Sequence, residues 1–187
     1  MVFPASHIET LYNSLLALPD GYRGEIVGGR LYTSPRPAAQ HVMVGSVLGA
    51  DLLNPFQRGQ GGPGGWWILD EPEVHLVRNI EVVVPDLAGW KRERMPSLPD
   101  DHRFEIVPDW VCEILSPGSG TYDREIKMPA YAGYGVRWLL WLIEPTFQLL
   151  QVYENNDSSW KLKNEFNADD SISAPPFSEV ILQPPWT

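Results

Sequence analysis

Apolar side chains recur every three or four residues in two stretches of the first third of the chain, 5–18 and 38–53. This spacing is the period of an amphipathic helix, so the pattern predicts two helices. The first ends before Pro19-Asp20-Gly21 and the second near Pro55, since proline interrupts helical hydrogen bonding. The apolar positions are Ile8, Leu11, Leu15 and Leu18 in the first stretch and Val44, Val47, Leu48 and Leu52 in the second.

Shorter apolar runs bounded by glycine and proline predict β-strands. The stretch GEIVGGRLYTS carries Gly28-Gly29 between two such runs and indicates a hairpin. The charged, proline-rich stretch 88–108 and the glycine-rich stretch 58–65 are typical of loops. The other predicted strands are 66–70, 73–77, 82–87, 110–115, 137–143 and 147–154, with weaker candidates at 159–164 and 179–183.

A third helix is predicted from about Tyr122 to Gly133, with a C-terminal glycine at Gly133 or Gly135. Pro129 lies inside it and removes a backbone donor, so a kink or a shortened first segment is expected. The order of helix, hairpin, helix, strands, helix and strands predicts a mixed α/β or α+β fold, with a sheet flanked by helices. We expect one domain over residues 1–187.

The composition is that of a soluble globular protein, with 43% hydrophobic and 20% charged residues. The formal net charge is −10, from 24 acidic and 14 basic residues. This balance counts against avid nonspecific binding of nucleic acid, because such binding depends on clustered lysine and arginine. Lys91, Arg92 and Arg94 form the best candidate for a local phosphate-binding cluster.

Cys112 is the single cysteine, so no internal disulfide forms, and its apolar neighbours indicate a buried structural thiol. The sequence shows no signal peptide and no apolar run of the ~20 residues that a membrane-spanning helix needs. We therefore expect a cytoplasmic protein that does not bind membranes.

Two carboxylates are candidates for chemistry. Asp86 ends the run VVVPD, and Glu113 interrupts the apolar run WVCEIL. Side chains alternate along a strand, so neighbouring strands would bring both carboxylates out at one end of the sheet. Adjacent carboxylates repel unless a cation lies between them, and Mg²⁺ is the hard, oxygen-preferring ion that suits such a pair.

Lys127 and Tyr131 follow on the predicted third helix, four residues apart and therefore on one face. A lysine beside a metal and a scissile phosphate can orient water or offset developing negative charge. Taken singly, Lys127 is typical of a solvent-facing helix position and Tyr131 of core packing. Only their combination with the two carboxylates points to a site.

Ordinary structural roles are alternative interpretations for several of these polar residues. Asp86 alone fits a solvated strand end, and Glu25 in RGEIVGG fits an exposed strand position. His41 has no partner at a metal-binding spacing, which favours a structural role over a metal ligand. Glu113 is harder to dismiss, because an unpaired glutamate in an apolar strand is costly. Sequence signatures of the P-loop, the nucleophile elbow and the dinucleotide fold are absent.

The stretch VPDLAGW, followed by WVCEILSPGSGTYDREIKMPAYAGYGVRWLLWLI, resembles the Uma-type restriction endonucleases, a branch of the PD-(D/E)XK nuclease superfamily. The resemblance covers about residues 22–153, and the segment 85–143 is its specific part. It implies a restriction-endonuclease-like core, with a mixed central sheet flanked by helices and an acidic site at one end.

Position by position, the resemblance assigns Asp86 to the aspartate of the PD motif and Glu113 to the second acidic position. Lys127 matches the lysine that this branch carries on the following helix, and Tyr131 the tyrosine after it. Glu25 falls on an acidic position of the N-terminal segment and is a possible third metal ligand. The superfamily's usual lysine would stand two residues after Glu113, where this chain has Leu115.

The leading hypothesis is an endonuclease that hydrolyses phosphodiester bonds, in DNA, with Mg²⁺ as cofactor and Mn²⁺ as a substitute. Asp86 and Glu113 would bind the metal, Lys127 would position water or stabilise charge, and Tyr131 would support the lysine. The alternative is a catalytically inactive nuclease-like module for binding or regulation, which the acidic charge and the displaced lysine favour. Activity on another phosphoester is a third hypothesis, and a homodimer is possible.

Overall fold

The computed structural model describes residues 5–116, 120–137 and 139–186. The helical segments are α1 (Ala5–Leu16), α2 (Ala39–Leu52), the π-helical turn η1 (Leu53–Gln57), α3 (Gly120–Tyr122), the π-helical turn η2 (Asp123–Lys127) and α4 (Met128–Gly133). The strands are β1 (Tyr22–Val27), β2 (Arg30–Pro35), β3 (Trp66–Asp70), β4 (Glu73–Val77), β5 (Glu81–Val83), β6 (Leu87–Lys91), β7 (Arg103–Phe104), β8 (Trp110–Ile114), β9 (Leu139–Glu144), β10 (Leu149–Asn156) and β11 (Ser159–Phe166).

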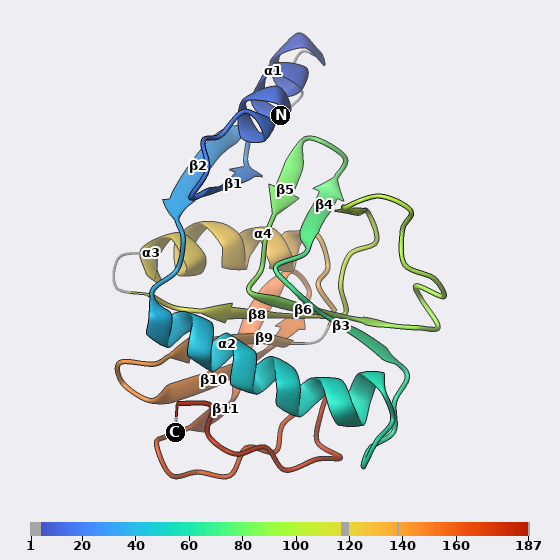
Figure 1. Cartoon of the computed structure of the whole chain (residues 1–187), viewed down its shortest axis with the longest axis vertical. Helices are drawn as coiled ribbons and strands as arrows, with labels where there is room; N and C mark the ends of the chain where they lie inside the picture. Colours follow the sequence, from blue (N-terminus) through green and yellow to red (C-terminus); the bar gives the residue numbers. More distant parts are fainter. Residues whose placement is uncertain (1–4, 117–119, 138, 187) are drawn as a thin grey trace.

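The strands form two sheets (Figure 1). The larger has the order β11-β10-β9-β8-β6-β3 and is antiparallel except for the parallel pair β8–β9. The smaller has the order β2-β1-β5-β4-β7, with β4–β7 as its parallel pair. The mixed central sheet that the sequence predicts is therefore confirmed, and a second sheet stands beside it.

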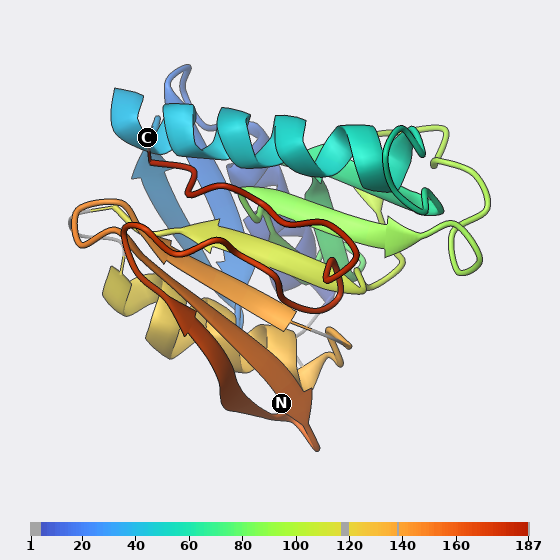
Figure 2. The same cartoon turned by 90° about the horizontal axis from the view of Figure 1, so that it is seen from below.

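Helices cover both faces of the larger sheet (Figure 2). On one face, α2 and the C-terminal segment 167–186 pack into a core that includes Leu48 and Phe177. On the other face, α4 and strands of the smaller sheet share a second core that includes Trp90 and Tyr131. Strand β8 serves both cores, because Trp110, Cys112 and Ile114 face the first and Val111 the second. Burial on both faces explains why WVCEIL is almost continuously apolar.

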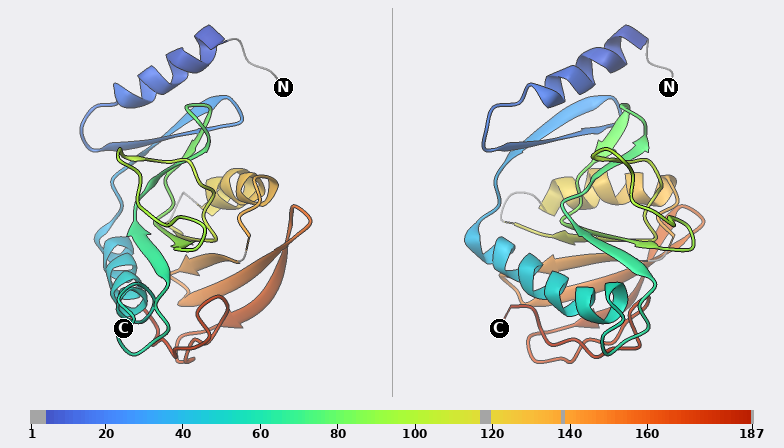
Figure 3. Two further views of the ribbon diagram at one scale, coloured as in Figure 1. Left: turned by 90° about the vertical axis from the view of Figure 1, so that its right-hand side faces the viewer. Right: turned by 45° about the vertical axis from the view of Figure 1, so that its right-hand side comes forward.

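The N-terminal helix α1 stands at the end of the molecule and packs on the β1–β2 hairpin (Figure 3). Buried Tyr12 joins Ile26 and Val82 in a third, smaller core. The hairpin turns at Gly28 and Gly29, both of which have positive φ, as the sequence predicts.

The predicted strand 82–87 and loop 88–108 are wrong in their boundaries. Strand β5 ends at Val83, the chain crosses between the sheets at 84–86, and β6 begins at Leu87 inside the predicted loop. Asp86 thus precedes a strand of the larger sheet instead of ending one. The prolines after Met95 made the whole stretch resemble a loop in the sequence, although Leu87, Ala88 and Trp90 are all buried.

The two prolines expected to end or interrupt helices lie within or just after a π-helical turn. Pro55 lies within η1, where the predicted helix exit continues for one more turn. Pro129 follows η2, in which the backbone N–H of Met128 bonds to the carbonyl oxygen of Asp123. A single π-helical turn shifts the hydrogen-bond register of a helix from i→i+4 to i→i+5, and here it precedes Pro129, which lacks an N–H group. The expected interruption of the third helix is confirmed.

Three further sequence predictions have mixed outcomes. The weak strand at 179–183 is reduced to an isolated bridge between Leu182 and Ile172. The predicted turn SPGSG includes residues 117–119, and the strand 137–143 includes residue 138, all of which lie outside the described residues. Across the part of the chain that is described, none of the helices is both long and apolar enough to span a membrane.

Candidate active site

Asp86 lies where the chain passes from the smaller sheet to the larger one. Its neighbour Leu87 pairs with Cys112 in the antiparallel β6–β8 ladder, so the register sets Asp86 opposite Glu113. The backbone N–H of Ile114 donates a hydrogen bond of 2.7 Å to Asp86 Oδ2. The two candidate carboxylates therefore come from adjacent strands, as the sequence analysis supposes. Asp86 reaches this position in a different way from the one expected: it precedes the first residue of β6 instead of ending a strand, and β6 runs antiparallel to β8.

Glu113 is buried, and its Oε1 atom accepts two hydrogen bonds from the following helix. Lys127 Nζ lies 2.7 Å from this oxygen, and the Tyr131 hydroxyl donates to it at 2.6 Å. The four-residue spacing places both donors on one helix face, as predicted. Lys127 is also buried, so the solvent-facing interpretation of Lys127 taken singly is wrong.

Glu25 enters the same cluster from β1. Its Oε1 atom lies 3.0 Å from Lys127 Nζ and accepts a 2.7 Å hydrogen bond from the backbone N–H of Val84. The ammonium group also contacts the carbonyl oxygen of Val84 at 3.3 Å. Glu25 is a buried residue, which contradicts the interpretation as an exposed strand position. It holds the crossover that presents Asp86.

The cluster has more carboxylates than cations. Burial raises the pKa of Glu113 well above its ordinary value; Lys127 opposes this shift, while the charges of Asp123, Asp86 and Glu25 reinforce it. Burial alone would lower the pKa of Lys127, but Glu113 and Glu25 hold it well above its ordinary value. Lys127 therefore stays charged, whereas the ionised form of Glu113 is disfavoured, and a further cation beside Glu113 would favour that ionised form.

Asp86 has a different environment, and its pKa is lowered. Burial pushes this pKa up, but the hydrogen bond and charge of His41 outweigh it, with help from Lys127 and the Ile114 N–H group. His41 Nε2 donates to Asp86 Oδ1 at 2.9 Å, while Nδ1 lies 3.0 Å from Ser116 Oγ. Asp86 is therefore an ionised carboxylate at neutral pH. The solvated-end interpretation of Asp86 is wrong, since the residue is buried.

His41 is a residue whose place in the site the sequence reasoning missed. It occupies the first turn of α2, on the same face as the buried residues Val44, Leu48 and Leu52. The signal that was missed is the spacing of His41 from these apolar residues, which places it on the buried face of α2, at the end of the helix near Asp86. These contacts are compatible with a structural function for His41. Its hydrogen-bond partner, however, is Asp86, a candidate metal ligand.

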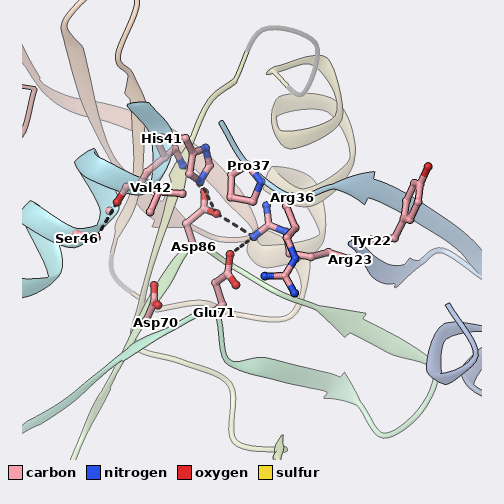
Figure 4. A pocket seen from close by; sticks show the side chains of 12 residues that line it. Tyr22, Arg23, Arg36, Pro37, His41, Val42, Ser46, Asp70, Glu71 and Asp86 are labelled. Atoms are coloured by element: carbon pink, nitrogen blue, oxygen red, sulfur yellow. Dashed lines mark hydrogen bonds and ion pairs between the residues drawn. The ribbon is translucent and has the colours of Figure 1, made fainter. Parts of the chain in front are cut away.

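A cavity of about 350 Å³ opens beside Asp86 (Figure 4). Arg23 and Arg36 supply its positive charge, and Asp70, Glu71 and Asp86 its negative charge. In Figure 4, Arg23 reaches between Asp86 and Glu71, and His41 contacts Asp86 from the opposite side. Among the predicted site residues, Asp86 lines this cavity, whereas Glu25, Glu113, Lys127 and Tyr131 lie in the buried cluster behind it.

The predicted basic cluster lies elsewhere. Lys91 is the last residue of β6, at the opposite end of the strand from Asp86, and Arg92 and Arg94 follow it. Arg92 donates to the carbonyl oxygens of Trp66 and Gln57, and Arg94 pairs with buried Asp109 at 2.8 Å. Arg92 and Arg94 thus hold loops in place, and none of the three residues lines the cavity beside Asp86.

Cys112 is buried in β8, next to Glu113, and pairs with Leu87 of β6. Burial raises the pKa of its thiol well above the ordinary value, and the charges of Asp86 and Glu113 add to the shift. A thiol held neutral in this way is a poor nucleophile. The structural interpretation of Cys112 is confirmed.

Among the described residues, no three His, Cys, Asp or Glu side chains are arranged as a preformed metal site. Mg²⁺ does not require one, since it is commonly held by one or two carboxylates together with water and substrate phosphate. Asp86 and Glu113 provide hard oxygen donors at neighbouring positions of the β6–β8 ladder, and Glu25 lies in the same cluster as Glu113. The donor chemistry therefore fits a divalent cation of this class.

Comparison with known proteins agrees with this architecture. The structure is similar to the crystal structure of a putative nuclease belonging to DUF820 from Anabaena variabilis, with a TM-score of 0.73 and 24% sequence identity. The match covers 94% of this chain and 95% of that one, so the two share a fold. No curated protein matches the chain.

A family model described as "Uma2: Putative restriction endonuclease" matches residues 10–184. The match includes both carboxylate-bearing segments, the helix that carries Lys127 and Tyr131, and the hairpin that carries Glu25. The chain therefore belongs to the Uma2 family of restriction-endonuclease-like proteins.

Proposed function

We propose that this protein is a Mg²⁺-dependent endonuclease that hydrolyses phosphodiester bonds in DNA, with Mn²⁺ able to replace Mg²⁺. One observation carries the proposal: Lys127 returns from the helix to within 2.7 Å of Glu113, directly behind the junction that presents Asp86. Family membership supports a nuclease with a nucleic-acid substrate. The choice of metal and of DNA is our inference from the chemistry of the site.

In this proposal, Asp86 and Glu113 hold the metal, and Glu25 is a further candidate ligand. The bound ion would lower the pKa of a coordinated water and offset charge on the phosphate. Lys127 keeps its proton in this environment and contributes positive charge near the developing phosphorane. Tyr131 holds Glu113 in place by donating a 2.6 Å hydrogen bond to it, and Glu113 in turn pairs with the lysine.

The first test measures cleavage of plasmid and single-stranded DNA with Mg²⁺, Mn²⁺ or EDTA, for the wild type and Asp86→Asn. We expect cleavage that requires the metal and falls by at least about a hundredfold in the variant, because loss of a key electrostatic contact in a site costs that much. Calorimetric titration of Mn²⁺ into both proteins provides a readout that does not depend on turnover. Equal cleavage by wild type and variant would refute the role of Asp86.

Lys127→Gln tests the displaced lysine. We expect cleavage to fall strongly while Mn²⁺ binding persists, because the variant removes a charge and keeps both carboxylates. Lys163→Gln is the matched control, since Lys163 is exposed and pairs with Glu154 on the surface at 2.8 Å. A variant that cleaves as fast as the control would remove Lys127 from the mechanism.

The alternative function is a nuclease-like module that binds without cleaving. It is favoured by the hydrogen bonds that Glu113 and Asp86 already make to Lys127, Tyr131 and His41, which any metal must compete with. Under this alternative, calorimetry finds no Mn²⁺ affinity and DNA stays intact in every metal. Homodimer formation is a separate prediction, which sedimentation equilibrium tests directly.

A further inference from the structure

Arg23 is shared between two carboxylates at the mouth of the cavity. Its Nη1 atom lies 2.5 Å from Glu71 Oε1 and 3.4 Å from Asp86 Oδ1 (Figure 4). The residue belongs to β1, and its side chain is 25% exposed, so the guanidinium group is partly open to the cavity. Arginine presents a planar fork of donors that matches phosphate oxygens as well as carboxylates.

Glu71 occupies its position at a conformational cost. It lies in the turn between β3 and β4 with φ of 43°, in the left-handed region that side chains other than glycine seldom adopt. Its backbone N–H bonds to the carbonyl oxygen of Asp86 at 3.2 Å, which ties the turn to the site. Strained backbone of this kind persists where the surrounding structure requires it, commonly at functional sites.

The two contacts of Arg23 respond differently to a metal. A cation held by Asp86 would repel the guanidinium group and weaken the longer, 3.4 Å contact. The contact with Glu71, whose side chain is 43% exposed, is more accessible to solvent than the contact with Asp86, whose side chain is 9% exposed. Glu71 thus places a carboxylate where an incoming anion would meet Arg23.

We propose that Arg23 binds a phosphate of the nucleic-acid substrate and that Glu71 competes with that phosphate for the same guanidinium group. The proposal rests on the proposed function for the identity of the substrate. It assigns opposite effects to the two residues. Removing Arg23 weakens substrate binding, and neutralising Glu71 strengthens it.

The test measures binding by fluorescence anisotropy of a short labelled single-stranded DNA, in Ca²⁺ and in EDTA, with gel analysis to check that the probe stays intact. The variants are Arg23→Ala and Glu71→Gln. The matched controls are Arg78→Ala and Glu105→Gln, because Arg78 and Glu105 form an ion pair of the same 2.5 Å length on the exposed surface away from the cavity. Thermal melting establishes that each variant is folded.

We expect Arg23→Ala to weaken binding about tenfold, the scale of one charge-assisted hydrogen bond. The slope of log affinity against log salt should fall by about 0.7, the value for one lost phosphate contact on a single strand. Glu71→Gln should tighten binding roughly threefold, since a neutral amide competes less well for a guanidinium group. Both controls should match the wild type in affinity and slope.

Two results would overturn the inference. Equal affinity and salt slope in Arg23→Ala and Arg78→Ala would remove Arg23 as a phosphate ligand, and an unchanged or lower affinity in Glu71→Gln would remove the competition. Absence of binding by any folded protein would overturn both parts. Because binding is measured without turnover, these results are distinct from a failure of metal-dependent cleavage, which would refute the proposed function alone.

Discussion

At the scale of the residue, burial and partners decide what each glutamate does. Glu113 and Glu73 both accept several hydrogen bonds, but their pKa values move in opposite directions. Burial disfavours the charge of Glu113, and the neighbouring carboxylates add to this effect. Glu73 accepts from Tyr12 and His75, each at 2.8 Å, and these contacts lower its pKa although burial alone would raise it. The first environment suits a site that needs a cation, and the second is a structural anchor.

Glu73→Gln tests the anchor through its pH dependence. The folded pKa of Glu73 lies below its ordinary value of 4.5, so the unfolded chain binds a proton more readily than the folded one. The stabilisation is therefore complete above that ordinary value and is lost as pH falls through the folded pKa. We expect urea unfolding to show a loss of about 1 kcal/mol at neutral pH that vanishes in acid.

Glu93→Gln is the control for this measurement, because the Glu93 side chain is 75% exposed and lies 3.7 Å from Lys91. Its free energy of unfolding should match the wild type within a few tenths of a kcal/mol at every pH. A Glu73→Gln deficit that stayed constant from neutral to acidic pH would contradict the charge-based explanation.

At the scale of the element, β6 determines how the two carboxylates meet. It lies between β8 and the edge strand β3 in the larger sheet, and its start fixes Asp86 opposite Glu113. Gly89 in its middle faces the rings of Trp66 and Trp110, and a Cβ added there would lie only 3.2–3.3 Å from ring atoms of both. The sequence suggested a loop here because the strand is short and a proline-rich stretch follows it.

Gly89→Ala tests the packing of β6. An added Cβ would lie 3.2 Å from Trp110 Cε3 and 3.3 Å from Ile68 Cδ1, and both neighbours are buried. We expect a loss of about 1–3 kcal/mol in the free energy of unfolding from overpacking. Gly133→Ala in α4 is the control, since its Cβ would meet nothing within 4 Å and alanine favours the helix. Equal stability of the two variants would contradict tight packing at β6.

At the scale of the whole molecule, the C-terminal segment completes the core behind the site. Fully buried Phe177 packs its ring 4.6 Å from that of Phe56 and 5.0 Å from that of Trp110, measured between centroids. The same core contains α2, which carries His41 to Asp86. The segment therefore supports the site although none of its described residues lines the cavity.

Phe177→Ala tests this support. We expect a loss of about 3–5 kcal/mol in the free energy of unfolding, the usual cost of deleting a buried aromatic ring. Phe147→Ala is the matched control, because Phe147 is 74% exposed and its removal should change stability little. A small loss in Phe177→Ala, comparable with that of the control, would show that the C-terminal segment is not part of the cooperative core.

The sequence by itself determined the local elements and the chemistry of the chain. Helical spacing, the Gly28-Gly29 hairpin and apolar runs are local signals, and they predicted the helices and most of the strands. The spacing of Lys127 and Tyr131 likewise predicted that both lie on one face of the helix, since a helix face is a local property. The segment from Asp86 to Tyr131 also carried the family resemblance, which the match over residues 10–184 confirmed.

Only the tertiary structure decided which distant residues join the site. Burial of Glu25 and the contact of His41 with Asp86 depend on how β1 and α2 pack against the larger sheet, and no local pattern encodes that packing. The start of β6 depends on its pairing with β3 and β8, which outweighs the weak propensity of a short run containing glycine. Arg23 and Glu71 meet across 48 residues of sequence, so their ion pair, and the competition inferred from it, exist only in the folded chain.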